Sequence, residues 1–102
     1  MPLVREALLQ MDHALALARK ERYRLVKLIH GYGSTGVGGE IRMAVQKRLR
    51  EMTESGQVRG CIFGEDWTIS DELTWKTVNA HAELKRDPDL GRRNLGITVV
   101  VL

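Results

Sequence analysis

Cysteine, proline and aromatic residues are all scarce in this sequence of 102 residues, and it has no long apolar run. The single cysteine, Cys61, excludes a disulfide framework and does not fit a structural zinc site, which takes about four ligands. No apolar stretch approaches the roughly 20 residues that span a bilayer, and the amino terminus lacks the regions of a signal peptide. We therefore predict a cytoplasmic protein that does not associate with membranes.

The length and the charge of the chain limit its organisation and its partners. A chain of this size holds one hydrophobic core, so residues 1–102 are predicted to form a single domain. The net charge is +3 and the isoelectric point is near 9.4. Residues 1–50 carry ten Lys and Arg against four Asp and Glu, whereas residues 51–102 carry six against nine. The amino-terminal half is therefore where a polyanion is expected to dock.

Hydrophobic periodicity indicates alternating helices and strands. The predicted helices cover residues 3–20, 40–54 and 71–85, and the predicted strands cover residues 24–29, 57–63 and 97–102. Ser70 is the expected cap of the third helix, and Asp87-Pro88 is its expected end. Residues 24–29 are mostly apolar on both faces, which is typical of an inner strand of a parallel sheet.

Together these elements predict an α/β (α+β) sandwich, in which helices pack on a small mixed sheet containing one βαβ unit over residues 24–63. Three strands are few for the helices that pack on them. The strand that begins near Arg24 or the one that ends at Leu102 is therefore expected to have an open edge, where a homo-oligomer could form.

Between the first predicted strand and the second predicted helix lies a glycine-rich segment, Gly31-Tyr32-Gly33-Ser34-Thr35-Gly36-Val37-Gly38-Gly39. Glycines let the backbone approach a ligand and direct successive N–H groups at an anion, and the following helix adds the positive end of its dipole. Phosphate is the ligand that suits such a loop best. The segment is not a P-loop, because Gly33 is followed after four residues by Gly38-Gly39-Glu40 in place of Gly-Lys-Ser/Thr, so the lysine is missing. It also lacks the acidic residue of a dinucleotide site. We predict no bound cofactor, and the use of a divalent metal is left open.

Other candidate residues have two interpretations each. His30, at the end of the predicted strand, suits a general acid/base or a hydrogen bond that fixes the loop. His13 and His81 are expected to be solvated, and Cys61 is expected to be a small buried residue. The two tryptophans, Trp67 and Trp75, either pack residues 65–95 onto the sheet, which we favour, or form a partner surface.

The motif His30-Gly31-Tyr32-Gly33, followed by Thr35-Gly36-Val37-Gly38, resembles the small MutS-related (Smr) domain. Arg42, early in the next helix, and the closing strand Gly96-Ile97-Thr98-Val99-Val100-Val101-Leu102 extend the resemblance over nearly the whole chain. The Gly64-Glu65-Asp66-Trp67 turn and the stretch from Asp87 to Asn94 look like a bacterial branch of stand-alone Smr proteins.

This resemblance implies a fold similar to the carboxy-terminal domain of a translation initiation factor, and binding of DNA or RNA. Members of the family act in repair, recombination or the handling of stalled ribosomes, and some cleave nucleic acid. The family pattern departs from this sequence at the front, where a strand with a Leu-Asp-x-His-Gly type motif precedes the first helix. Residues 1–8 look like that helix directly, so the acidic and imidazole groups of the motif are missing.

Three functions follow from these observations. The first is a nucleic-acid-binding domain that grips backbone phosphates; its candidate residues are His30, Gly31, Tyr32, Gly33, Ser34, Thr35, Gly36, Gly38, Gly39 and Arg42. The second is an endonuclease in which His30 moves a proton and Arg42 offsets developing charge; Glu65 and Asp66 could face the same sheet edge, although the resemblance does not nominate them. The third is an interaction module that pairs through the open sheet edge.

Overall fold

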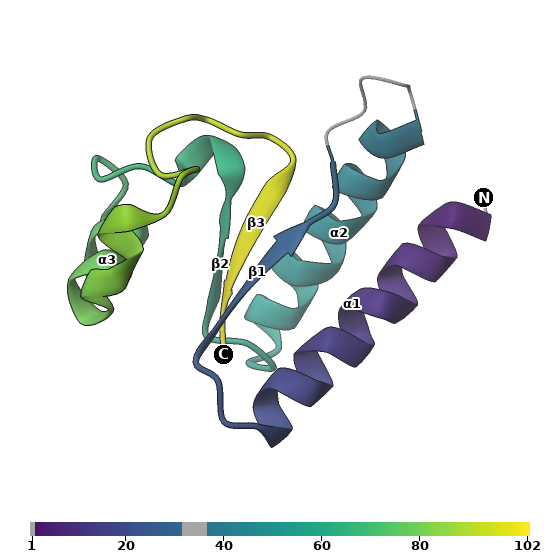
Figure 1. Ribbon diagram of the computed structural model, residues 1–102. Helices are drawn as coiled ribbons and strands as arrows, with labels where there is room; N and C mark the ends of the chain where they lie inside the picture. The colour runs from purple at the N-terminus through teal and green to yellow at the C-terminus, as the bar shows by residue number, and fades with distance from the viewer. Residues whose placement is uncertain (1, 32–36) are drawn as a thin grey trace.

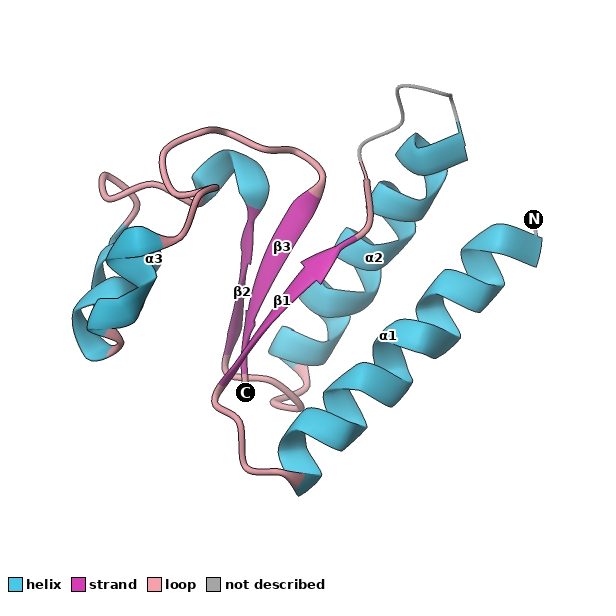
Figure 2. Cartoon of the chain, in the orientation of Figure 1, coloured by secondary structure: helices cyan, strands magenta, loops and turns pink. Residues whose placement is uncertain are grey.

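The computed structural model describes residues 2–31 and 37–102 and has a sheet between two layers of helices (Figure 1). The helices are α1 (Pro2–Lys20), α2 (Val37–Glu54) and α3 (Glu72–Ala80), with short 3-10 helices η1 (Gly64–Asp66) and η2 (Ala82–Arg86). The strands are β1 (Leu25–Ile29), β2 (Gly60–Phe63) and β3 (Ile97–Val101). Figure 2 shows α1 and α2 on one face of the sheet and α3 on the other. The predicted α/β class is therefore confirmed.

The pairing of the strands differs from the prediction. The strand order is β1-β3-β2, and β3 is antiparallel to both neighbours, so the hydrogen-bonded pairs among the described residues are not mixed. The βαβ connection from β1 through α2 to β2 is present, but β3 lies between its two strands. The central position suits β3, because four of its five residues are buried, whereas β1 is half-buried and lies at the edge.

The edge position of β1 bears on self-association. Of the two strands expected to have an open edge, β1 has one, and its last residue Ile29 is 81% exposed. The strand that ends at Leu102 does not, because β3 is central. Formation of a homo-oligomer through β1 stays a prediction, which light scattering can test.

Each helical layer has its own core on the sheet. Leu15 of α1, Leu49 of α2 and Val100 of β3 are buried together on one face. Trp67, only 1% exposed, packs with Ile62 and Val78 on the other face. The packing role predicted for the tryptophans is thus confirmed for Trp67 and wrong for Trp75, which is 53% exposed on α3.

The start of α3 corrects a second prediction. Asp71, not Ser70, is the N-cap: its carboxylate accepts a hydrogen bond from the backbone N–H of Thr74 at 3.0 Å. Both residue types favour the N-cap position, so composition alone does not decide between neighbouring serine and aspartate residues. The helix ends at Ala80, and η2 carries the chain to Arg86, just before Asp87.

A polar network holds the segment before β3 against the edge strand. Lys27 of β1 forms ion pairs with Asp87, at 3.0 Å, and with Asp89. The indole N–H of Trp67 donates to Asp87 at 2.9 Å, and the Asn94 amide donates to Asp89 at 2.9 Å. The Asn94 hydrogen bond and then the Lys27 ammonium lower the pKa of Asp89. This network fixes the approach to β3, which positions the site described next.

Candidate nucleic-acid interface

His30 lies where β1 ends, and its backbone is tied to the segment before β3. The N–H groups of His30 and Gly31 both donate to the carbonyl of Gly96, at 2.9 and 3.1 Å. Gly31 has φ of +80°, in the left-handed region that side chains with a Cβ rarely adopt. A glycine at this position therefore lets the chain turn out of the sheet directly after His30.

Both ring nitrogens of His30 have partners. Nδ1 lies 2.6 Å from the Gly31 carbonyl oxygen, and Nε2 lies 2.9 Å from Oγ1 of Thr98, a fully buried residue. A carbonyl oxygen only accepts, so these contacts assign the proton to Nδ1 and make Nε2 the acceptor from the Thr98 hydroxyl. Burial, assisted by the nearby Arg42 charge, lowers the pKa of His30 below its usual 6.5. The imidazole is therefore neutral near pH 7 and serves to fix the strand end.

Arg42 projects from α2 toward the 3-10 helix that follows β2. Its guanidinium forms an ion pair with Glu65, and the Gln46 amide donates to the same carboxylate at 3.3 Å. Arg42 Nε is buried and has no hydrogen-bond partner among residues 2–31 and 37–102. Since a buried unpaired donor costs free energy, this guanidinium retains capacity for another acceptor.

Glu65 reaches Arg42 because the chain passes very close to itself at Gly64. A Cβ on Gly64 would lie 1.7 Å from the carbonyl oxygen of Asn94, a clash that no rotamer relieves. Only glycine therefore lets η1 approach the segment before β3. The sequence suggested that Glu65 and Asp66 could face this edge; the ion pair of Glu65 with Arg42 bears this out for Glu65.

The structure brings some of the predicted site residues together and leaves others undescribed. His30, Gly31 and Arg42 lie around one end of the sheet, and Arg42 contributes to the electrostatic environment of His30. Gly38 and Gly39 belong to the first turn of α2, which begins three residues earlier than predicted. The remaining candidates, Tyr32, Gly33, Ser34, Thr35 and Gly36, lie outside the described residues.

Thr98 was not among the residues predicted from the sequence. It is the one hydroxyl residue of the otherwise apolar β3. Because β-branched residues are common in strands, a threonine there does not indicate a functional role. The available signal was the expectation that a buried hydroxyl needs a partner. In the register of the sheet Thr98 is opposite Leu28. His30 comes two residues after Leu28 and therefore points to the same face of the sheet.

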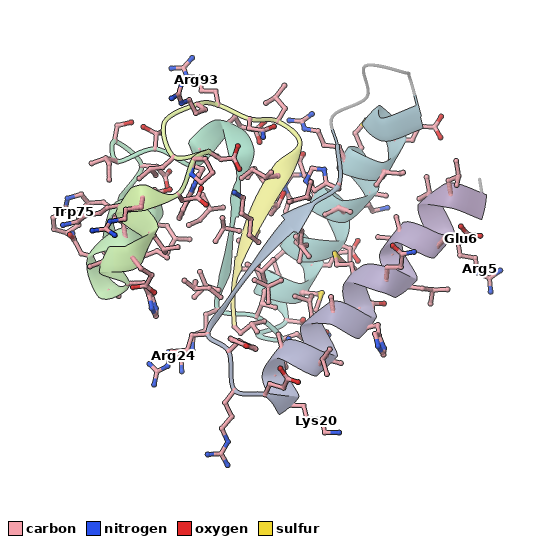
Figure 3. The ribbon with its side chains drawn as sticks, in the orientation of Figure 1. Arg5, Glu6, Lys20, Arg24, Trp75 and Arg93 are labelled. Carbon is pink, nitrogen blue, oxygen red and sulfur yellow. The ribbon has the colours of Figure 1, made fainter. Side chains whose placement is uncertain are left out.

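The positive charge near this site comes from both halves of the chain, Arg42 from the first and two further arginines from the second. Arg92 and Arg93 are exposed in the turn before β3, and Figure 3 shows Arg93 at the end of the sheet where β1 finishes. Lys20 and Arg24, from the basic half of the sequence, lie at the opposite end (Figure 3). These two residues therefore lie away from His30, and docking of a polyanion on the amino-terminal half stays a prediction.

Other classes of site find little support in the described residues. No three His, Cys, Asp or Glu side chains there are grouped so that they could hold a metal ion. A hollow of about 350 Å³ beside His30 is lined mainly by apolar side chains such as Leu28, Ile29 and Ile41, a poor lining for a phosphate. No helix among those described is both long and apolar enough to cross a bilayer.

The fold is that of an Smr-like domain, as the glycine motif and the closing strand predicted. The chain is similar to the crystal structure of the Smr domain of Thermus thermophilus MutS2. The TM-score is 0.57 at 27% sequence identity, and the match covers 97% of this chain and 85% of that chain. No protein-family model and no curated protein matches the sequence.

Proposed function

We propose that this domain binds DNA or RNA by gripping backbone phosphates at the end of the sheet where His30, Gly31 and Arg42 lie. The observation that carries the proposal is the Arg42 guanidinium, which has a buried, unpaired Nε among the described residues and is held by one partly exposed carboxylate. A phosphate presents several oxygens to the guanidinium fork, so it can replace Glu65 and also use the remaining donors.

Two further features support the same ligand. The amino-terminal turn of α2, an 18-residue helix, lies at this end of the sheet and offers unsatisfied N–H groups with a positive dipole. Arg92 and Arg93 add exposed positive charge nearby. In this arrangement His30 is a positioning residue, because its two nitrogens are occupied in holding Gly31 and Thr98. The contacts are to phosphate, so we expect little discrimination between base sequences.

The test is the binding of labelled single-stranded DNA and RNA oligonucleotides, followed by fluorescence anisotropy at several salt concentrations. We expect affinity to fall steeply between about 50 and 200 mM salt, and Arg42→Gln to reduce the salt slope by about 0.7, the value for one phosphate of a single strand that is no longer neutralised. Arg5→Gln, an exposed change on the outer side of α1 (Figure 3), is the control with the same change of charge. Binding that ignores salt, or that responds equally to both variants, contradicts the proposal.

An endonuclease is the second candidate, and one observation favours it. Glu65 supplies a carboxylate beside Arg42 and His30, which the sequence alone could not assign. For His30 to move a proton, its Thr98 or Gly31 hydrogen bond must first break, so we rank this function below binding. A plasmid nicking assay that compares the unaltered protein with His30→Ala tests it, and equal activity in the two would exclude His30 from the reaction.

A further inference from the structure

We propose that a basic hollow on the α3 face, at the opposite end of the sheet from His30, is a second anion site that binds a phosphate group. The hollow has a volume of about 440 Å³. Leu25 and Val101, which are paired across β1 and β3, line its apolar side. Its cationic lining comprises Arg24, Arg59 and Lys76, and the imidazole of His81 adds a polar group.

The sheet places Arg24 and Arg59 on either side of the same strand end. The carbonyl of Arg24 accepts from the N–H of Leu102 at 2.9 Å, and the N–H of Arg59 donates to the carbonyl of Val101 at 2.8 Å. Since neighbouring strands are about 4.8 Å apart, the two arginine backbones are separated by about 10 Å across the end of β3. Two long side chains can converge on one anion over that distance.

The acidic groups near the hollow compete weakly. Glu72 pairs with Lys76 at 3.1 Å, and Glu83 lies 3.7 Å from His81, but both carboxylates are largely exposed. Exposed ion pairs contribute little to stability, so a phosphate can replace them. Arg24 and Arg59 are exposed and form no ion pair with any residue that the structure describes. The site therefore holds positive charge that the fold does not use.

The composition of the hollow suits a phosphate group. Two guanidinium groups provide paired donors that match phosphate oxygens, and a lysine adds a compact charge. The apolar side formed by Leu25, Ala80 and Val101 leaves room for the uncharged part of a nucleotide. Free nucleotides and polynucleotide backbones both present this group, and the experiment separates them.

The experiment is an NMR titration of the whole chain with inorganic phosphate, adenosine 5′-monophosphate and a 12-nucleotide DNA, at constant ionic strength set by chloride. We expect saturable shifts at the amides of Arg24, Arg59 and Val101. The double variant Arg24→Gln/Arg59→Gln should weaken phosphate binding by about tenfold or more, equivalent to about 1.4 kcal/mol. Arg5→Gln/Lys20→Gln removes the same charge from exposed positions on α1 and should change it less than about twofold.

The outcomes distinguish this site from the one proposed above. If the mononucleotide and the oligonucleotide both cause shifts, and both sets vanish in the Arg24→Gln/Arg59→Gln variant, the site binds phosphate groups in general. If only the oligonucleotide causes shifts, the site binds a polynucleotide. Either pattern must persist in Arg42→Gln, because that residue lies at the other end of the sheet. The proposal is overturned if no probe shifts these amides, or if both double variants lose affinity equally.

Discussion

The ion pair between Arg42 and Glu65 leads to a prediction with an unusual sign: removing Glu65 should strengthen nucleic-acid binding. In the unbound protein Glu65 occupies the guanidinium that the proposed phosphate contact needs. A phosphate must therefore displace the carboxylate or bind beside it. Glu65→Gln keeps the shape of the side chain and an acceptor for the Gln46 amide, but removes the competing charge.

The size of the effect follows from the exposure of the pair. The Arg42 and Glu65 side chains are 24% and 34% exposed, so solvent screens the pair and it is worth about 1 kcal/mol rather than the several of a buried pair. Release of that interaction corresponds to about fivefold tighter binding. The same change should lower the free energy of unfolding by up to about 1 kcal/mol, because the folded protein no longer has the pair. Affinity and stability thus move in opposite directions.

The assay is fluorescence anisotropy with a labelled oligonucleotide at about 50 mM salt, where phosphate contacts contribute strongly, alongside urea unfolding. Glu54→Gln is the matched control, since it removes one exposed carboxylate at the last residue of α2, far along the helix from Arg42. We expect the control to bind at most slightly more tightly than the unaltered protein. Unchanged or weaker binding by folded Glu65→Gln would refute the role assigned to Arg42.

Two further predictions concern stability. Gly64→Ala should lower the free energy of unfolding by about 3 kcal/mol in urea titrations, because its Cβ would clash with the Asn94 carbonyl. Gly39→Ala should be neutral or stabilising, because no atom of the residues that the structure describes lies within 4 Å of its added Cβ. Equal effects of the two substitutions would contradict the close approach of η1. Stability should also fall on acidification in two steps. Burial lowers the pKa of His30 in the folded protein, so the unfolded chain binds the imidazole proton more tightly. The stabilisation is therefore complete above about pH 6.5 and is lost as the pH falls through the pKa of His30 in the folded protein. The pKa of Asp89 is lowered from 3.8, mainly by the Asn94 hydrogen bond, which gives a second loss below about pH 4; Asp89→Asn should abolish only this second step.

The sequence predicted the elements well because each has a local signal. The apolar spacing of α1 and α2 and the β-branched run of β3 are properties of short windows, and Gly56, with φ of +79°, ends α2 as expected. The pairing of strands has no such signal. Residues 25–29 are apolar enough for an inner strand, and only the competition with β3, which is more completely buried, places them at the edge.

The site was predicted in part for the same reason. His30, Gly31 and Arg42 belong to a motif that can be read along the chain. Glu65 and Thr98 come from segments distant in sequence, and their roles depend on a close approach at Gly64 and on the register of the sheet. A glycine that tolerates no Cβ looks, in a sequence, like any other turn glycine.

The distribution of charge over the fold differs from its distribution along the sequence. A strand carries the chain from one end of a sheet to the other, so Arg24 and His30, on either side of the five-residue β1, must lie about 17 Å or more apart. Lys20 and Arg24 are therefore separated from His30 (Figure 3), although all three belong to the same half of the sequence. Residues 51–102 show the opposite case. Because β3 is antiparallel to β1, the turn before β3 brings Arg92 and Arg93 to the end of the sheet where His30 lies. Strand direction, more than net charge, decides which cations can meet at one phosphate.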